Sequence, residues 1–163
     1  MTTLPLGFHS HTANIGVKDD TDDFVVIAAS TAIPTAAVFT RSRFAGPSVT
    51  LSRVHVENGL SQAVIVISKN ANVATGKAGR ENAIEVARLV AERLGFDPYD
   101  VVVTSTGVIG RTYPMDRIRD GISQTPNPLT SADADGPARG MMTTDTVPKI
   151  AESVVAGSTA RVV

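Results

Sequence analysis

The sequence predicts one domain of the mixed α/β (α+β) class, over residues 1–163. Two short β-branched runs, 63–68 and 101–103, are typical of buried strands. Between them, residues 80–94 repeat apolar side chains at three- and four-residue spacing, which is typical of an amphipathic helix. The order of strands and helices therefore favours a layered fold over a helical bundle or a β-sandwich.

The N-terminal part predicts a pair of neighbouring strands. Residues 6–12 are expected to form an edge strand or an irregular segment, and the acidic stretch 18–23 a turn. Residues 24–29 are continuously apolar, which predicts a strand buried on both faces. A connection at 31–35 leads to a second strand at 36–40, and it is short enough for a hairpin.

In the middle of the chain, polar and apolar residues alternate over the short stretch 48–52. Residues 53–60 predict a short helix that ends at Asn58-Gly59. A polar loop, 69–79, then precedes the amphipathic helix, after which Gly95 stands where a C-terminal cap is expected.

After the strand at 101–103, Thr112 is expected to cap a helix with Pro114 in its first turn and Met115, Ile118 and Ile122 on its buried side. The remaining segments are expected to be a surface loop at 124–136, a helical turn at 138–142, and strands at 154–155 and 161–163.

Composition limits the function classes. Hydrophobic residues make up 42% of the chain but aromatic residues only 4%, so the core must be mainly aliphatic. A formal net charge of −1 gives no electrostatic case for binding nucleic acid or an anionic membrane. The absence of cysteine excludes disulfides and thiolate chemistry. No apolar run reaches the ~18 residues that span a bilayer and no secretory signal is visible, so we expect a cytoplasmic protein.

The clearest candidate for chemistry is the corner where the strand at 101–103 ends in Ser105-Thr106-Gly107. Glycine lets a backbone approach a ligand closely, and such a corner can aim donors at a developing negative charge. The simpler interpretation, a strand followed by a tight turn, is the commoner one.

Other polar groups give weaker signals. His9 and His11 would share one face of a strand, but no third ligand stands beside them. The aspartates at 19, 20, 22 and 23 lack the glycine and glutamate of a calcium loop. Residues 76–79 fail the phosphate-loop pattern.

Side chains that could bind a ligand have equally plausible structural roles. Asn70 and Asn72 can bind a ligand or their own loop. Arg41 and Arg43 can grip a carboxylate or form a solvated strand face. Thr143, Thr144 and Thr146 are read as substrate hydrogen-bonders or turn residues.

Four segments together resemble one known family: 37–47 (AVFTRSRFAGP), 70–76 (NANVATG), 105–110 (STGVIG) with Pro114-Met115, and 142–146 (MTTDT) with Pro148-Lys149. In this order they resemble the N-terminal half of the ornithine acetyltransferase (ArgJ-like) family, the bifunctional glutamate N-acetyltransferases. The likeness runs from about Phe8 to Lys149. The first two segments look most like actinomycete paralogues of secondary-metabolite clusters.

The resemblance implies a layered αββα sandwich of the N-terminal-nucleophile-like type. It implies a precursor that cuts itself before a threonine, which becomes the nucleophile of a separate β-chain in an α2β2 heterotetramer. Acetyl passes from N-acetylornithine to glutamate by a ping-pong route. No coenzyme or metal is implied, although acetyl-CoA is a possible alternative donor.

Carried onto this sequence, the resemblance makes Thr106 and Gly107 the oxyanion-hole pair and Thr143 or Thr144 a substrate-contacting threonine. Asn70 and Asn72 match a family loop without an assigned role. The family's Gly-x-Ala-Lys-Gly stretch and Met-Ala-Thr cleavage point are not in this sequence, so we expect an α-chain that is inactive alone. The alternatives are an amide hydrolase of the same fold, an acyltransferase with another amino-acid acceptor, and a non-enzymatic domain that binds an amino acid.

Overall fold

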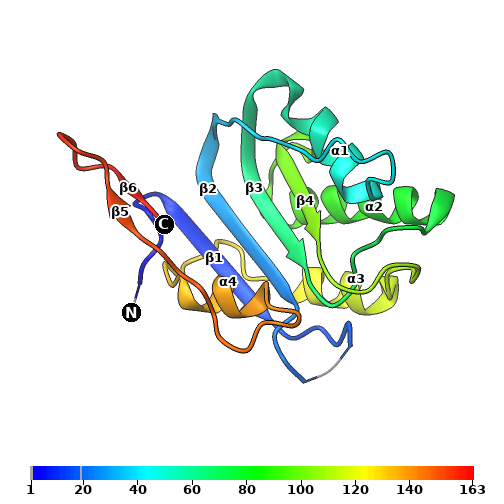
Figure 1. Ribbon diagram of the computed structural model, residues 1–163. Coiled ribbons are helices and arrows are strands. Elements are labelled where there is room, and N and C mark those ends of the chain that lie inside the picture. Colours follow the sequence, from blue (N-terminus) through cyan, green and yellow to red (C-terminus); the bar gives the residue numbers. More distant parts are fainter. Residues whose placement is uncertain (1, 19) are drawn as a thin grey trace.

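A four-stranded sheet organises the computed structural model, which describes residues 2–18 and 20–163. Its strands are β1 (Phe8–Ala13), β2 (Phe24–Pro34), β3 (Leu60–Ile67) and β4 (Val101–Ser105), in the order β1-β2-β3-β4 (Figure 1). β2 pairs antiparallel with both β1 and β3, whereas β3 and β4 are parallel. The polar segments that follow β3 and β4 therefore leave the sheet at the same end.

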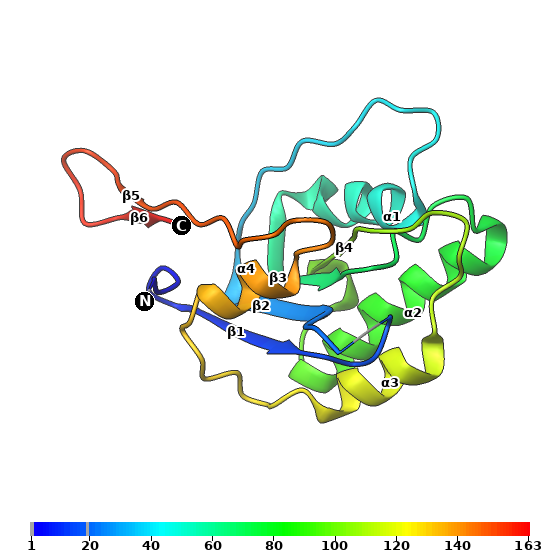
Figure 2. The same cartoon turned by 60° about the horizontal axis from the view of Figure 1, so that its bottom comes forward.

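One face of the sheet packs on α2 (Gly76–Leu94) and α3 (Met115–Gln124), and the main core lies between them (Figure 2). The core is aliphatic, as the composition predicts, because β-branched residues of the strands pack against small and branched residues of the helices. Its fully buried members include Val26, Ile65, Val86, Val103 and Ile118.

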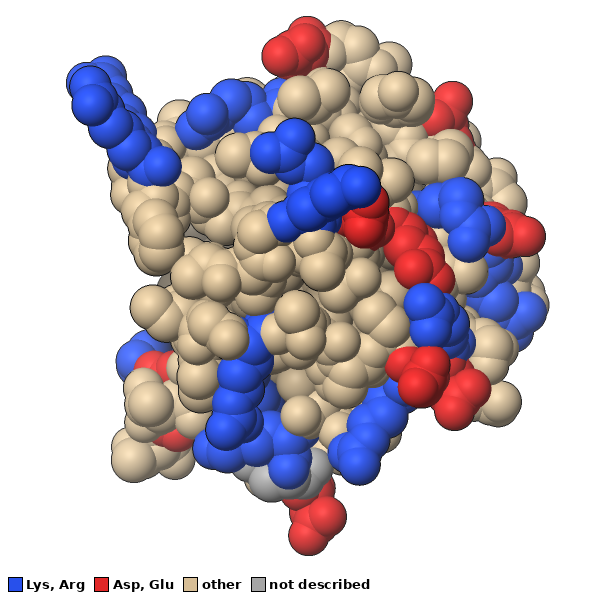
Figure 3. Space-filling model, turned by 90° about the vertical axis from the view of Figure 1, so that its right-hand side faces the viewer, with Lys and Arg blue, Asp and Glu red and all other residues tan. Residues whose placement is uncertain are grey.

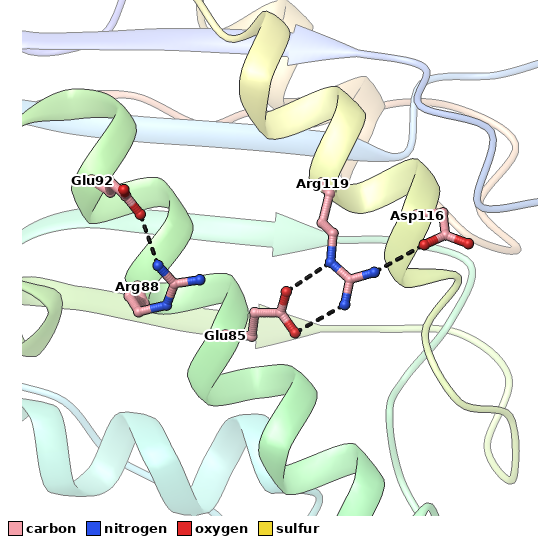
Figure 4. A network of polar contacts seen from close by, with 5 residues as sticks. All are labelled: Glu85, Arg88, Glu92, Asp116 and Arg119. Carbon is pink, nitrogen blue, oxygen red and sulfur yellow. Dashed lines mark hydrogen bonds and ion pairs between the residues drawn. The ribbon is translucent and has the colours of Figure 1, made fainter.

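A network of ion pairs joins α2 to α3 on the solvent-facing side of these two helices (Figure 4). Arg119 of α3 donates to Glu85 of α2 at 2.7 and 3.2 Å and to Asp116 at 2.9 Å. The guanidinium of Arg119 lowers the pKa of Glu85 through these hydrogen bonds. A separate pair, Arg88 and Glu92, lies one turn apart along α2 at 2.8 Å.

The outer edge of β4 is covered by α1 (Pro47–His55), which hydrogen-bonds to the strand through polar side chains. Ser52 Oγ donates to the Val103 carbonyl at 2.7 Å and accepts the Val103 N–H at 2.9 Å. Nδ1 of His55 lies 2.8 Å from the Val101 carbonyl. The edge of the sheet is thus satisfied without a further strand.

The opposite face of the sheet carries α4 (Asp135–Gly140), which packs over β1 and β2. Val25 lies under Gly140, where a Cβ would sit 2.4 Å from the valine Cγ2. Further along this face, Val64 and Val102 are only half-buried. The chain ends in a small ribbon of β5 (Ser153–Val154) and β6 (Arg161–Val162). Among the described residues, no helix is long and apolar enough to cross a membrane.

The mixed α/β class, the strands at 63–68 and 101–103 and the long helix are confirmed. Gly95 has the predicted left-handed conformation with φ 77°, and Ile118 and Ile122 are buried in α3. The edge strand at 6–12 is β1. Asp19, part of the predicted acidic turn, lies outside the described residues.

The predicted hairpin of 24–29 with 36–40 is wrong. β2 continues through the expected connection to Pro34, and residues 36–40 have no regular structure. The physical reason is that β1 and β3 occupy both edges of β2, so no edge remains for a further strand.

Several predicted helix boundaries are also wrong. Residues 48–52 are helical, because α1 begins at Pro47, and a short 3₁₀ turn, η1 (Val56–Asn58), follows it. The helix predicted at 80–94 begins at Gly76. α3 begins after Pro114 without a side-chain cap from Thr112, and α4 begins at Asp135 rather than 138.

Candidate functional site

The parallel pairing of β3 and β4 places the segments that follow them side by side. Asn70 forms isolated β-bridges with both Thr106 and Val108. The N–H of Val108 donates to the Lys69 carbonyl at 3.3 Å, and the N–H of Ala71 donates to the Val108 carbonyl at 3.0 Å. The corner at 105–110 is therefore fixed by the loop that starts at Lys69.

Gly107 sits at the tightest point of this contact. Its φ of 128° is a conformation that L side chains rarely adopt. A Cβ built on Gly107 would lie 2.3 Å from the carbonyl carbon of Lys69 and 2.7 Å from the nitrogen of Asn70. Both obstacles are backbone atoms, so only glycine suits this position.

Two donors at the corner remain available to a ligand. The backbone N–H of Thr106 is used, since it donates to the Ile67 carbonyl at 3.1 Å. Within the described residues, neither the Thr106 hydroxyl nor the Gly107 N–H makes a hydrogen bond of ordinary geometry. Thr106 is half-buried and Gly107 is exposed. The pair can therefore donate to an oxygen anion that reaches the corner from outside this chain.

The loop 69–75, next to the corner, has an unusual backbone conformation. Lys69, Asn72 and Ala74 all have positive φ angles, of 70°, 48° and 60°. Non-glycine residues seldom adopt this region, and such strain clusters at functional sites.

Asn70 and Asn72 hold this loop together. Asn72 is fully buried, and its Nδ2 donates to the Gly79 carbonyl at 2.9 Å. Asn70 accepts the N–H of Asn72 at 2.9 Å and donates to the Thr112 carbonyl at 3.1 Å. Of the two interpretations of these asparagines, hydrogen bonding within their own loop is confirmed.

A cluster of hydroxyl groups supports the strand end from inside. Ser105 Oγ hydrogen-bonds both Ser48 Oγ, from the first turn of α1, and the phenol of Tyr113. Tyr113 is 4% exposed, and burial raises the pKa of its phenol. Ser48 and Tyr113 could not be recognised from the sequence, because nothing in their local patterns shows that they converge on Ser105.

The segment 40–47 reaches the same corner. A Cβ at Gly46 would lie 2.8 Å from Cγ2 of Val73 and 3.2 Å from the Asn72 carbonyl oxygen, so Gly46 packs closely on the 69–75 loop. Arg41 and Arg43 are exposed on the irregular stretch before it. The strand-face alternative for these arginines is wrong, because no strand forms there.

Thr143 and Thr144 lie in the loop after α4. Ser68 Oγ, at the end of β3, donates to the Gly140 carbonyl and ties the start of this loop to the strand. Figures 1 and 2 both show the loop passing the end of the sheet where β3 and β4 terminate. Thr143 is half-buried and Thr144 is exposed. Nothing in these contacts assigns either hydroxyl a role.

The remaining predicted sites do not join this corner. His11 lies on β1 with its ring 6.3 Å from that of Phe24, and burial lowers the pKa of His11. The described residues include no group of three or more His, Cys, Asp or Glu placed to hold a metal. A mostly apolar cavity of about 350 Å³ lies on the other face between α4 and residues 147–151, and Thr106 and Gly107 do not line it.

Comparisons with known proteins point to one family. The model described as the ArgJ family matches residues 9–163. Glutamate N-acetyltransferase Oat2 of Streptomyces clavuligerus is 49% identical over 156 residues, which are 95% of this chain and 40% of that protein. Arginine biosynthesis bifunctional protein ArgJ 2 of Nostoc sp. is 47% identical over 150 residues, 92% of this chain and 39% of that protein. The chain thus spans about two fifths of the length of these curated relatives.

Two solved structures share the fold. The Bacillus halodurans arginine biosynthesis bifunctional protein ArgJ has a TM-score of 0.87 at 32% identity, covering 99% of this chain and 87% of that chain. Ornithine acetyltransferase of Mycobacterium tuberculosis, solved in complex with ornithine, has a TM-score of 0.79 at 30% identity, covering 88% of this chain and 79% of that chain.

Proposed function

This chain belongs to the ArgJ family, and on that premise we propose that it is the α-chain of an enzyme that transfers acetyl from N-acetylornithine to glutamate. Similarity to a glutamate N-acetyltransferase and to an ornithine acetyltransferase solved with ornithine supports both substrates. The cytoplasm is the proposed location, since these are substrates of amino-acid biosynthesis.

The observation that carries the proposal is the pair of free donors at the end of β4. Acyl transfer passes through a tetrahedral intermediate whose oxygen carries negative charge, and preset donors stabilise that charge. The hydroxyl of Thr106 and the N–H of Gly107 would donate to this oxygen. Thr143 or Thr144 would contact the substrate.

The nucleophile is proposed to come from another chain. The hydroxyl of an N-terminal threonine, on a β-chain cut from the same precursor, attacks the acetyl carbonyl and expels ornithine with its proton. The amino group of glutamate then attacks the acyl-enzyme, forms N-acetylglutamate and restores the threonine. In this scheme the two chains form an α2β2 heterotetramer, and neither a coenzyme nor a metal takes part.

Two length comparisons support a divided protein. The curated relatives are about 2.5 times longer than their match to this chain, because that match covers only 39–40% of them. In contrast, this chain covers 87% of the Bacillus halodurans chain. A family polypeptide of nearly this length therefore exists as a chain of its own.

The test uses the full-length protein that contains this chain. We expect mass spectrometry to find two polypeptides and, after incubation with N-acetylornithine alone, an acetyl adduct on the N-terminal threonine of the second. Adding glutamate should convert the adduct to N-acetylglutamate. Release of ornithine without N-acetylglutamate would instead identify an amide hydrolase.

A further inference from the structure

We infer, resting on the proposed function, that Tyr113 is a positioning residue whose phenol keeps the donors of Thr106 and Gly107 in place. Tyr113 is buried, so it acts through Ser105, the residue that immediately precedes the donor pair. Preset donors stabilise an oxyanion best when they need not reorganise during the reaction. The contacts that anchor this segment therefore bear on the rate.

The segment between β4 and α3 is anchored from inside by Tyr113. Residues 107–112 are all exposed, and Tyr113 is the first buried residue after them. Its ring packs in the main core, and its phenol hydrogen-bonds Ser105 Oγ at the end of β4. This contact closes the segment 105–113 into a loop. The two donors lie within that loop, directly after Ser105.

The outer side of the same loop is held by the segment that follows β3. The N–H of Gly110 donates to the Val73 carbonyl at 2.7 Å, and Asn70 Nδ2 donates to the Thr112 carbonyl at 3.1 Å. Without the phenol of Tyr113, these contacts would hold the far part of the loop from one side only. An exposed segment held in this way opens more readily.

The phenol belongs to a set of three hydroxyl groups. Ser48 Oγ, from α1, hydrogen-bonds Ser105 Oγ and lies 3.4 Å from the phenol oxygen of Tyr113. A hydroxyl both donates and accepts, so the three groups can satisfy one another. Burial raises the pKa of the Tyr113 phenol. The group therefore stays neutral at physiological pH and places no negative charge beside the developing oxyanion.

The charged surface on this side of the molecule is mixed in sign. Figure 3 shows the side that lies on the right in Figure 1, toward which the segment between β4 and α3 extends, and acidic and basic side chains are intermixed on it. A surface of mixed charge produces no strong field of one sign. Stabilisation of the oxyanion therefore depends on the local donors and on what holds them.

The experiment compares Tyr113→Phe, Ser105→Ala and Ser48→Ala with the wild type, all as full-length protein. Each variant loses hydrogen bonds of the same hydroxyl cluster, but only Ser48→Ala leaves the contact between Tyr113 and Ser105 in place. It is therefore the matched control for a purely structural effect. Tyr99→Phe, at an exposed ring, is the control for the tyrosine substitution.

Steady-state kinetics of acetyl transfer give kcat and both KM values. Misplacing a catalytic group by about 1 Å can cost about 10²-fold in rate. We expect Tyr113→Phe and Ser105→Ala to lower kcat by about tenfold, with both KM values changed less than about threefold. The reason is that the same donors serve both half-reactions and act in the transition state. Ser48→Ala should lower kcat less than about threefold, although its Tm falls by an amount similar to that of Tyr113→Phe.

Amide hydrogen exchange adds a readout that does not depend on activity. The N–H groups of Val108 and Gly110 both donate to the segment after β3, so their exchange reports opening of the loop. We expect mass spectrometry of the loop peptide to show faster exchange in Tyr113→Phe and Ser105→Ala than in the wild type. Ser48→Ala should keep the wild-type rate.

Losses of kcat that follow the losses of Tm in all three cluster variants would assign the cluster a structural role and overturn the positioning role. Unchanged kcat in Tyr113→Phe, or a lower kcat without faster exchange, would overturn it as well. Each of these results leaves the proposed function intact. A wild-type protein without transfer activity would refute the proposed function, and the positioning role with it.

Discussion

Gly107 touches the backbone of Lys69 so closely that no side chain fits between them, although the two residues belong to segments that follow different strands. The three atoms nearest to a Cβ at Gly107 are all backbone atoms of Lys69 and Asn70, at 2.3 to 2.7 Å. The corner at 105–110 and the loop at 69–75 therefore form one packed unit. A substitution in either segment should change the structure of both.

Gly107→Ala should break this unit. The added methyl must displace backbone, and the φ of 128° is unfavourable for alanine, so we expect a loss of about 2–4 kcal/mol in the free energy of unfolding. Urea denaturation measures it. Gly110→Ala is the matched control, because Gly110 has φ 77° but nothing lies within 4 Å of its Cβ. We expect the control to cost about 1–2 kcal/mol. Equal losses for the two variants would contradict the close contact.

Tyr113→Phe should remove the hydrogen bonds of the phenol from the hydroxyl cluster. The hydrogen bond between Ser48 and Ser105 should remain. We expect a loss of about 1 kcal/mol near neutral pH, measured by denaturation. Tyr99→Phe, with an exposed ring, serves as the control.

The pH dependence of the same variant has a definite sign. Burial raises the pKa of Tyr113 above its usual value of 10.0 in the folded protein, so the unfolded chain loses this proton first. Its contribution to stability is fully present below pH 10 and falls as the pH rises through the folded-state pKa. We expect Tm to fall less steeply above pH 10 in Tyr113→Phe than in the wild type. Parallel curves of Tm against pH for the variant and the wild type would contradict this expectation.

Glu85→Gln should remove the negative charge and one of the two acceptor oxygens of the bidentate contact with Arg119 that joins α2 and α3. We expect Tm to fall by only a few degrees at neutral pH, since exposed ion pairs contribute little. Arg119 lowers the pKa of Glu85 below its usual 4.5, so this contribution is present above pH 4.5 and is lost as the pH falls through the folded-state pKa. The difference in Tm between the two proteins should therefore vanish in acid and shrink in high salt. A difference that persists in acid would rule out the ionised carboxylate as its origin.

The sequence predicted those elements whose patterns are local. β3, β4 and α2 bury apolar residues at the spacing that their own geometry requires. The strand expected at 36–40 failed because strand pairing is a non-local property, and both edges of β2 were already occupied. The part of α1 before Arg53 was not predicted, because Ser48, Ser52 and His55 form the buried side of this helix, and hydrophobic periodicity does not detect a helix that packs through hydrogen bonds.

The candidate site likewise has features that local sequence patterns predict and features that depend on strand pairing. The sequence marks Thr106 and Gly107 as a glycine corner after a strand, and the family resemblance adds their role. It does not reveal the approach of Lys69, because that contact exists only once β3 and β4 pair in parallel. A lysine also gives no sequence signal for a left-handed backbone, whereas glycine or asparagine would.

Thr106→Ala tests the proposed oxyanion donor most directly. Its hydroxyl makes no hydrogen bond of ordinary geometry within the described residues, and its backbone N–H keeps the Ile67 carbonyl as a partner. The substitution should therefore leave Tm almost unchanged. Removing one oxyanion donor typically lowers kcat by about 10²–10³-fold, and we expect a loss near the lower end, with Thr106→Ser restoring most of it. Both variants are assayed for acetyl transfer in the full-length protein. Unchanged kinetics in Thr106→Ala would remove the hydroxyl from the proposed mechanism and leave the Gly107 N–H as the remaining donor of the proposed pair.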